Sequence, residues 1–266
     1  MDERNPKPLD AGRTGVFSPR DKQGHTAAMQ AILITDLHLR DPDESPDAAA
    51  HAARVGAHLD HTVEIARKAD CCILMGDLAD AGEPGAYGWL KHRLDALPFP
   101  AIPMLGNHDD RPAFREVFGI KGDCNGFIQS ARDFGDRRFV FLDTLDPGRD
   151  AGILCRNRLD WLDDKLGEGG EICLFLHHPP CDIGDPALDP INLANAKDLA
   201  ALLRRHGNVR QIFFGHVHRT IFLSWHGIPC AGLDSLGAGS SPAQTRAIGL
   251  LARGREGVTL AVRPLA

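Results

Sequence analysis

Short apolar runs alternate with longer amphipathic stretches from residue 31 onward, and this alternation constrains the fold more than any other feature of the chain. The first run, residues 31–35, is too short and too rich in β-branched side chains for a core helix, so it predicts a buried strand. Val55, Leu59 and Val63 then recur at helical spacing within residues 47–68. Strands at 72–75 and 101–105, with a helix at 86–97 between them, continue the pattern. This succession predicts parallel strands joined by crossover helices.

The second half of the chain predicts further strands at residues 139–142, 172–176 and 211–214. A helix is expected at 193–206, with Asn192 as its N-cap and Gly207 at its C-terminal end. The last four strands are expected at residues 220–225, 228–231, 246–251 and 258–262. Turns that contain glycine join them, which is typical of an antiparallel meander. We therefore expect an α/β fold in a single domain over residues 29–266, with a mixed sheet completed by the C-terminal strands.

Charge and cysteine content exclude several classes of protein. The chain has 30 Lys+Arg against 36 Asp+Glu, a net charge of -6, which argues against a protein that coats long nucleic acid. Its apolar runs are far shorter than the roughly 20 residues of a membrane-spanning helix. The 7 cysteines form no CxxC pair, which predicts reduced thiols and a cytoplasmic protein. Residues 1–28 are rich in Pro, Gly and charge, so we expect a flexible tail rather than a signal peptide or anchor.

Polar side chains that can bind a metal follow five of the predicted strands. The segments are Asp36-Leu37-His38, Gly76-Asp77, Gly106-Asn107-His108-Asp109, His177-His178-Pro179-Pro180 and Gly215-His216-Val217-His218. Ligands of open α/β sheets bind at the carboxyl ends of the strands. Each segment alone is ordinary turn chemistry. Ordinary turns do not explain why all of them choose metal-binding side chains at one end of the sheet, so the sequence predicts a metal centre there.

The kinds of side chain indicate the kind of centre. Imidazole, carboxylate and amide oxygen together suit Mn, Fe, Zn or Co, and no cysteine is placed to form a structural zinc site. The candidate ligands are too many for one ion with open positions, but they suit two ions that share a carboxylate. Alternate residues of an extended strand end point the same way, so we expect Asp36 and His38 to face one ion together. The same spacing relates His216 to His218.

These five segments, in this order, resemble the calcineurin-like metallophosphoesterase superfamily over residues 32–218. The resemblance implies mixed β-sheets in a sandwich flanked by helices, with the metal site at the C-terminal ends of the strands. It implies one ion held by Asp36, His38 and His218, a second held by Asn107, His177 and His216, and Asp77 as the bridge. His108 would contact the phosphate or protonate the leaving oxygen, with Asp109 as its orienting partner. His178 is expected behind the ligands or facing the substrate.

Three segments resemble the class III cyclic-nucleotide phosphodiesterase and glycerophosphodiesterase branch: residues 106–110, 177–180 and 188–191. The protein-phosphatase branch instead tends to carry Arg beside its Gly-Asp and Gly-Asn-His segments, where this chain has Met75 and Leu105. A diester monoanion needs less positive charge around it than a monoester dianion does. Arg111 lies near enough in the sequence to weaken this argument.

The expected function is hydrolysis of small phosphodiesters, cyclic nucleotides or glycerophosphodiesters, by attack of a metal-bridging hydroxide. A phosphomonoesterase and a non-catalytic scaffold are the alternatives. The expected partner is thus a small phosphodiester, with no long nucleic acid and no membrane, and the oligomeric state stays open. Because few residues follow His218, we expect loops 39–46, 144–152 and 181–195 to select the substrate. His51, His58 and His61 match no segment of the family and are expected on a partly solvated helix face.

Overall fold

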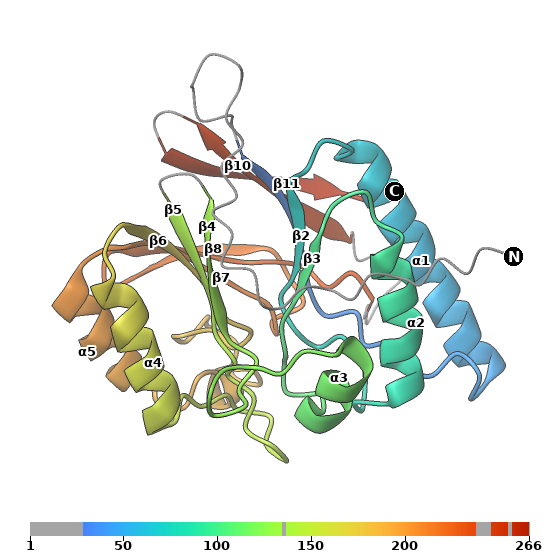
Figure 1. Ribbon diagram of the computed structural model, residues 1–266, viewed down its shortest axis with the longest axis horizontal. Coiled ribbons are helices and arrows are strands. Elements are labelled where there is room, and N and C mark those ends of the chain that lie inside the picture. Colours follow the sequence, from blue (N-terminus) through green and yellow to red (C-terminus); the bar gives the residue numbers. More distant parts are fainter. Residues whose placement is uncertain (1–28, 135–136, 238–245, 255–256, 266) are drawn as a thin grey trace, which may run out of the picture.

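The computed structural model describes residues 29–265 except 135–136, 238–245 and 255–256 (Figure 1). The tail predicted for residues 1–28 lies outside the described residues. Two β-sheets pack face to face, and helices cover the outer face of each, which gives four layers (Figure 1). No helix in the described part of the chain has the length and apolarity needed to cross a membrane.

The first sheet has the strand order β11-β10-β1-β2-β3. Its parallel strands are β1 (Gln30–Ile34), β2 (Cys71–Leu74) and β3 (Ala101–Pro103). The hairpin of β10 (Ala247–Gly254) and β11 (Gly257–Pro264) adds antiparallel to β1. Helices α1 (Pro46–Ile65), α2 (Pro84–Asp95) and α3 (Arg111–Phe118) cover this sheet (Figure 1).

The second sheet has the order β4-β5-β6-β7-β9-β8. Strands β5 (Arg137–Phe141), β6 (Glu171–Phe175), β7 (Val209–Phe214) and β9 (Ile228–Gly232) run parallel to one another. The edge strands β4 (Ser130–Phe134) and β8 (Ile221–Trp225) pair antiparallel. Helices α4 (Arg156–Gly167) and α5 (Ala196–His206) cover the outer face, and a 3-10 turn (Asp189–Ile191) precedes α5 (Figure 1).

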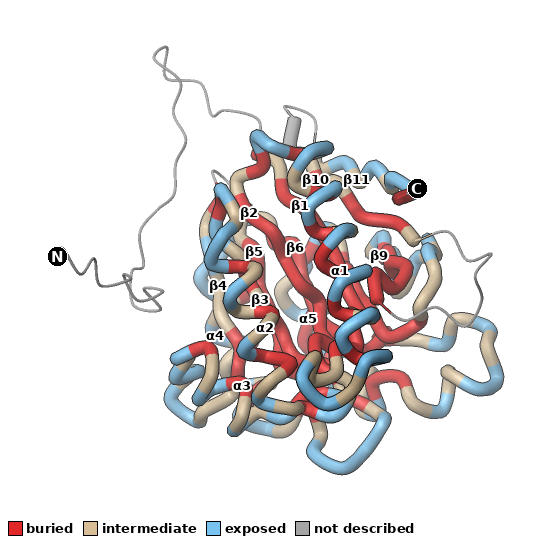
Figure 2. Tube along the Cα trace, turned by 90° about the vertical axis from the view of Figure 1, so that its right-hand side faces the viewer, coloured by how far each residue is buried: buried red, intermediate tan, exposed pale blue. Residues whose placement is uncertain are grey.

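The two sheets meet in an apolar layer that explains why the central strands are almost continuously hydrophobic. Leu33 and Ile73 from the first sheet share this layer with Phe139, Phe175 and Phe213 from the second. The ring of Phe175 stacks on that of Phe213 with centroids 5.0 Å apart. A parallel strand covered on both faces has no solvent-facing side, so it needs no alternating polar residues. Figure 2 shows these strands as buried stretches in the interior of the molecule.

The predicted fold class, mixed β-sheets in a sandwich flanked by helices, is confirmed, but the C-terminal strands differ from the single meander expected. The β8–β9 hairpin ends the second sheet, whereas the β10–β11 hairpin joins the first. The predicted N-cap Asn192 is also wrong, because this buried amide donates to the backbone carbonyl of Cys181 instead. Asn195 occupies the N-cap position of α5, and Gly207 ends the helix in a left-handed conformation as expected.

Candidate metal centre

The five polar segments meet at one end of the two packed sheets, beside the C-terminal ends of strands from both. Strands β1, β2 and β3 of the first sheet and β6 and β7 of the second all end on this side of the molecule, and each is followed by one segment. The side chains predicted as metal ligands are mostly buried there. Asp36 and His177 are fully buried, and the side chain of His218 is the most open of the histidines among them, at 36% exposed.

Backbone conformation, rather than strand alternation, aims these side chains. Asp36, His38, Asp77, His216 and His218 all have positive φ angles, between 45° and 70°. This left-handed region is uncommon for residues other than glycine, and such strained positions cluster at functional sites. The expectation that Asp36 and His38 converge as alternate residues of an extended strand is therefore wrong in its reason. They converge because the chain makes tight left-handed turns immediately after the strand.

One group of side chains gathers around Asp36. The Nε2 atom of His218 lies 3.2 Å from Oδ1 of Asp36 and 3.1 Å from Nε2 of His38. The same His38 nitrogen lies 3.5 Å from Oδ2 of Asp77. These four residues place one ligand atom each within 4.8 Å of one another. Predicted ligands of the first ion, and the predicted bridge, thus lie together.

A second group continues from Asp77 on its other side. Nε2 of His177 lies 3.2 Å from Oδ2 of Asp77. Nδ1 of His216 lies 3.1 Å from Oδ1 of Asn107, and the His177 and His216 rings are 5.3 Å apart. Asp77 therefore adjoins both groups, as the predicted bridging ligand should. Which of these atoms bind metal stays a prediction.

The donor atoms fit a cation better than they fit one another. Nδ1 of His177 donates to the backbone carbonyl of Met75 at 2.8 Å, so in the neutral ring the lone pair of Nε2 faces a carboxylate oxygen of Asp77. Two acceptors at that distance repel unless a proton or a metal ion lies between them. Nε2 of His177 is buried without a hydrogen-bond partner among the described residues. A buried nitrogen with this property is typical of a metal ligand.

The pKa values of the buried carboxyl groups and histidines also indicate that this site favours bound positive charge. Burial opposes the ionised forms of Asp36 and Asp77, yet the neighbouring histidines hold the pKa of both carboxyl groups below the usual value. Burial likewise opposes a charged His177, but the facing Asp77 raises the pKa of that ring to about 9. Burial, reinforced by His177, lowers the pKa of His216 to about 4. Without metal the site therefore holds protons on some of its histidines, and metal ions would replace them.

Position 106 requires glycine because the side chains of Asp77 and His177 lie very close to its backbone. A Cβ atom there would overlap the carboxylate of Asp77 and would lie 2.6 Å from Nε2 of His177. A side chain at this position would push apart the two groups that face each other at the centre. The glycine before Asn107 is thus explained by packing around the ligands, beyond ordinary turn chemistry.

The two residues predicted to be catalytic occupy different surroundings. His108 is exposed, and its Nδ1 lies 2.7 Å from the backbone carbonyl of Asp80, so this nitrogen donates and Nε2 is left for a ligand. Asp109 does not orient His108, contrary to expectation. Its buried carboxylate instead accepts from the backbone N–H groups of Leu78, Ala79 and Gly106 and from the hydroxyl of Tyr87. Asp109 therefore ties together the loops after β2 and β3.

Three residues that support the centre were not assigned a role from the sequence. Asp80 accepts from Nδ1 of His38 at 3.2 Å, which leaves Nε2 of that ring facing the centre. Thr35 donates to the Asp36 carboxylate at 2.6 Å, and Ser235 donates to the Asp36 backbone carbonyl at 2.6 Å. Asp80 follows the candidate ligand Asp77 by three residues, and this closeness in the sequence is the signal from which its role could have been found. Nothing in the sequence links Ser235 to a residue 199 positions away.

The remaining histidines lie outside the candidate ligand set. His51, His58 and His61 lie on α1, where His61 is exposed and the other two are half-buried. His178 is buried beside His177 and His216, but Thr144 and Asp150 use both of its ring nitrogens. The fully buried ring of His178 thus lies beside the candidate ligands His177 and His216, and which of its two expected roles it has stays a prediction.

The chain matches the calcineurin-like phosphoesterase family over residues 29–220. A probable cyclic nucleotide phosphodiesterase of Rhodopseudomonas palustris is 40% identical to it over 216 residues, which span 76% of each chain. The glycerophosphodiester phosphodiesterase GpdQ of Enterobacter lignolyticus is 31% identical over 196 residues, 70% of this chain and 69% of that one.

Solved structures show the same fold. A dimetal phosphatase from Danio rerio has a TM-score of 0.65 with this structure at 18% identity, and the match covers 90% of this chain and 99% of that one. At such low identity the likeness concerns the fold alone. The family match and the similarity to the two bacterial relatives, by contrast, show to which family the chain belongs. The chain therefore belongs to the calcineurin-like phosphoesterase family, in the branch that holds these relatives.

Proposed function

We propose that this protein hydrolyses small phosphodiesters, either cyclic nucleotides or glycerophosphodiesters, at a centre of two metal ions. As a member of its family and branch, the chain is a metal-dependent phosphoric diester hydrolase. The relatives from Rhodopseudomonas palustris and Enterobacter lignolyticus bear the names of enzymes for these two substrate classes, which supports the choice. The two adjoining ligand groups around Asp77 support a pair of ions rather than one.

The position of Arg111 carries the preference for diesters over monoesters. This guanidinium follows Asn107 by four residues, so it is a group that could have neutralised the second charge of a monoester. Instead it donates to both carboxylate oxygens of Asp143, at 2.7 and 2.8 Å, and to the backbone carbonyl of Leu145 at 2.9 Å. Asp143 is fully buried, and Arg111 compensates its charge together with the backbone N–H groups of Ile128 and Leu145. Arg111 therefore spends its hydrogen bonds within the protein, and in this proposal it does not bind the phosphate.

The residues have separate tasks in this proposal. Asp36, His38 and His218 would hold one ion, Asn107, His177 and His216 the other, and Asp77 would contact both. When bound, Mn, Fe, Zn or Co ions would neutralise the phosphate oxygens and make water nucleophilic at neutral pH. His108 lies at the exposed rim with its Nε2 available, so it can give a proton to the departing alkoxide. The backbone N–H of His108 donates to Asp77 at 3.0 Å, which fixes this histidine relative to the bridge.

A paired assay tests the proposal. Purified protein loaded with Mn²⁺ is given bis(p-nitrophenyl) phosphate and, separately, p-nitrophenyl phosphate. We expect faster cleavage of the diester, with almost all activity lost in Asn107→Ala. Asn125→Ala is the matched control, because Asn125 is exposed and contacts Asn157 rather than the centre, so this variant should behave as the unaltered protein.

The two alternatives predict different results. Faster cleavage of the monoester would identify a phosphomonoesterase and would contradict the argument from Arg111. A protein that takes up no metal and cleaves neither compound would be a non-catalytic scaffold. Unfolding curves recorded with and without added Mn²⁺ separate this last outcome from a failure of loading, since the unfolding of a scaffold would not change with metal.

A further inference from the structure

Both ring nitrogens of His178 are used by protein groups. Nε2 lies 3.0 Å from the backbone carbonyl of Asp150, and Nδ1 lies 2.8 Å from the hydroxyl oxygen of Thr144. A carbonyl can only accept, so Nε2 carries the proton and donates to Asp150. Nδ1 must then accept from the Thr144 hydroxyl. The ring has no lone pair left for a metal ion, although it packs 4.8 Å from the ring of His216.

The ring of His178 lies where two of the predicted substrate loops cross. A Cβ atom at Gly152 would overlap this ring, so only glycine lets the chain pass so closely. The N–H of Gly152 donates to the carbonyl of Asn192 at 3.2 Å, and the N–H of Ala194 donates to the carbonyl of Gly152 at 2.8 Å. Loop 144–152 is thus tied to loop 181–195 directly against His178.

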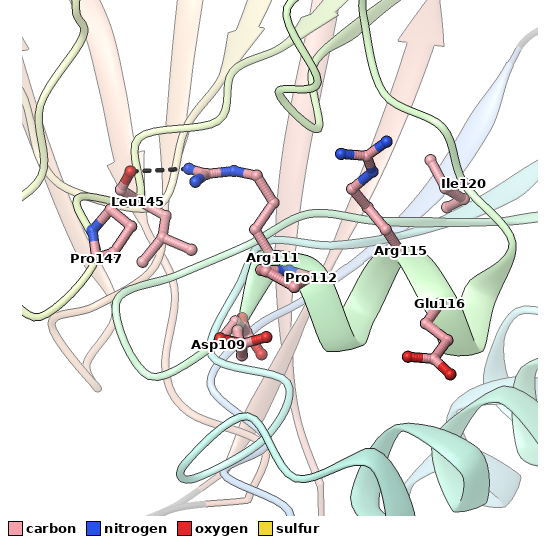
Figure 3. Close-up of a pocket in the computed structure, with 9 residues that line it drawn as sticks. Asp109, Arg111, Pro112, Arg115, Glu116, Ile120, Leu145 and Pro147 are labelled. Atoms are coloured by element: carbon pink, nitrogen blue, oxygen red, sulfur yellow. Dashed lines mark hydrogen bonds between the residues drawn. The ribbon is translucent and has the colours of Figure 1, made fainter.

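Loop 144–152 also forms one wall of a hollow of about 580 Å³ (Figure 3). Leu145 and Pro147 line one side, Arg115 from α3 lies on the other, and Arg111 lies between them (Figure 3). Asp109, two residues after the candidate ligand Asn107, is among the residues that line the hollow, so the hollow adjoins the segment that carries His108. Its volume is that of pockets that hold small organic ligands.

The wall is held from two directions. On the side of α3, the guanidinium of Arg111 donates a hydrogen bond to the carbonyl of Leu145. Thr144, the neighbour of Leu145, is fully buried and bonded to His178 from the side of the metal centre. The position of this wall therefore depends on the same strand end that supplies His177.

We propose that His178 is a positioning residue that sets loop 144–152 against the metal centre and so decides how large an ester group enters the hollow. The inference rests on the proposed phosphodiesterase function. Within that function it concerns how the enzyme tells diesters with one ester group of the size of a nucleoside from diesters with smaller groups. His178 acts here through Thr144 and Asp150 and touches neither metal nor phosphate.

The test removes the hydroxyl that holds the ring. Thr144→Val keeps the shape of the side chain but leaves Nδ1 of His178 without a donor. KM and kcat are measured for two chromogenic diesters, the p-nitrophenyl ester of thymidine 5′-phosphate and methyl p-nitrophenyl phosphate. We expect KM for the nucleotide ester to rise about tenfold, with little change for the methyl ester and unaltered metal content. Thr144→Ser, which restores the hydroxyl, should recover the original KM.

Thr62→Val is the matched control. It removes an equally buried hydroxyl that bonds only the carbonyl of His58 within α1, so both KM values should stay as they are. Equal losses on both diesters, or none on either, would overturn the role of His178 in substrate selection.

Hydrogen–deuterium exchange gives a second readout that needs no substrate. The amides of Gly152 and Ile153 are bonded within this region, to the carbonyls of Asn192 and Thr144. In Thr144→Val we expect them to exchange about tenfold faster while the central strands keep their protection. Unchanged exchange would contradict the proposal. If the unaltered protein cleaves neither diester, the proposed function fails on its own, and the exchange result still decides whether His178 positions the loop.

Discussion

At the scale of single residues, the ring of His108 has one committed nitrogen and one free for chemistry. Because Nδ1 donates to the carbonyl of Asp80, removal of the ring should leave the candidate ligand residues in place. We expect His108→Ala to retain its metal and to lose about 10²- to 10⁴-fold in kcat on diesters with poor leaving groups. The loss should be much smaller with p-nitrophenolate, which needs no proton. A series of aryl and alkyl diesters measures this, and an equal loss along the series would remove the general-acid role.

A substitution at Asp80 tests whether a hydrogen bond to a candidate ligand affects the affinity for metal. Its carboxylate accepts from Nδ1 of His38 and so keeps Nε2 of that ring unprotonated toward the centre. Asp80→Ala should weaken metal binding by about tenfold or more, as titration calorimetry with Mn²⁺ would measure. Glu64→Ala is the matched control, since Glu64 faces His61 at 3.6 Å on the exposed side of α1. Equal affinities in the two variants would show that Asp80 does not orient His38.

At the scale of elements, the buried pair of Arg111 and Asp143 joins the start of α3 to the end of β5. Arg111→Ala would leave a fully buried carboxylate with less compensation, so we expect the free energy of unfolding to fall by about 3 kcal/mol. Urea unfolding measures the change. Arg156→Ala breaks an ion pair with Asp160 on the open surface of α4 and should leave stability unaltered. A similar effect of both substitutions would mean that burial does not determine the strength of the first pair.

Elements with strong periodicity were predictable from the sequence, and elements that depend on tertiary contacts were not. The buried strands β1, β2, β6 and β7 were found because a strand covered on both faces is apolar throughout. The edge strand β4 was missed, since its pattern is largely half-exposed. Helix α4 was missed although it has 12 residues, and so was helix α3. Helix α3 has only 8 residues and is defined by the cap at Asp110 and the left-handed Gly119 rather than by length.

The same distinction holds for the site. The segments after the strands predicted which side chains would meet, because the carboxyl ends of parallel strands share one edge. Sequence could not show that Asp109 bonds backbone amides, or that Ser235 reaches Asp36 from the far end of the chain. Such contacts depend on how loops from two sheets pack, and no periodic pattern records that packing.

At the scale of the whole molecule, metal should stabilise the fold because the centre joins loops from both sheets. Binding adds about 4 kcal/mol to the free energy of unfolding when free metal is a thousandfold above its Kd. Urea unfolding with Mn²⁺ and with a chelator measures this difference. Asn107→Ala, which removes one expected ligand, should show a smaller increment. An increment of the same size in that variant would place the bound metal elsewhere.

The stability of the metal-free protein should also depend on pH in a defined direction. The pKa of His177 rises from 6.5 to about 9 on folding, because Asp77 faces the buried ring. A raised pKa contributes stability that is fully present below pH 6.5 and is lost as the pH rises through about 9. Over the same window the increment from Mn²⁺ should grow, since the ion no longer competes with that proton. Unfolding curves at a series of pH values measure both trends. A metal-free protein that keeps its stability up to pH 9, or an increment that does not change, would contradict the exchange of a proton for metal at His177.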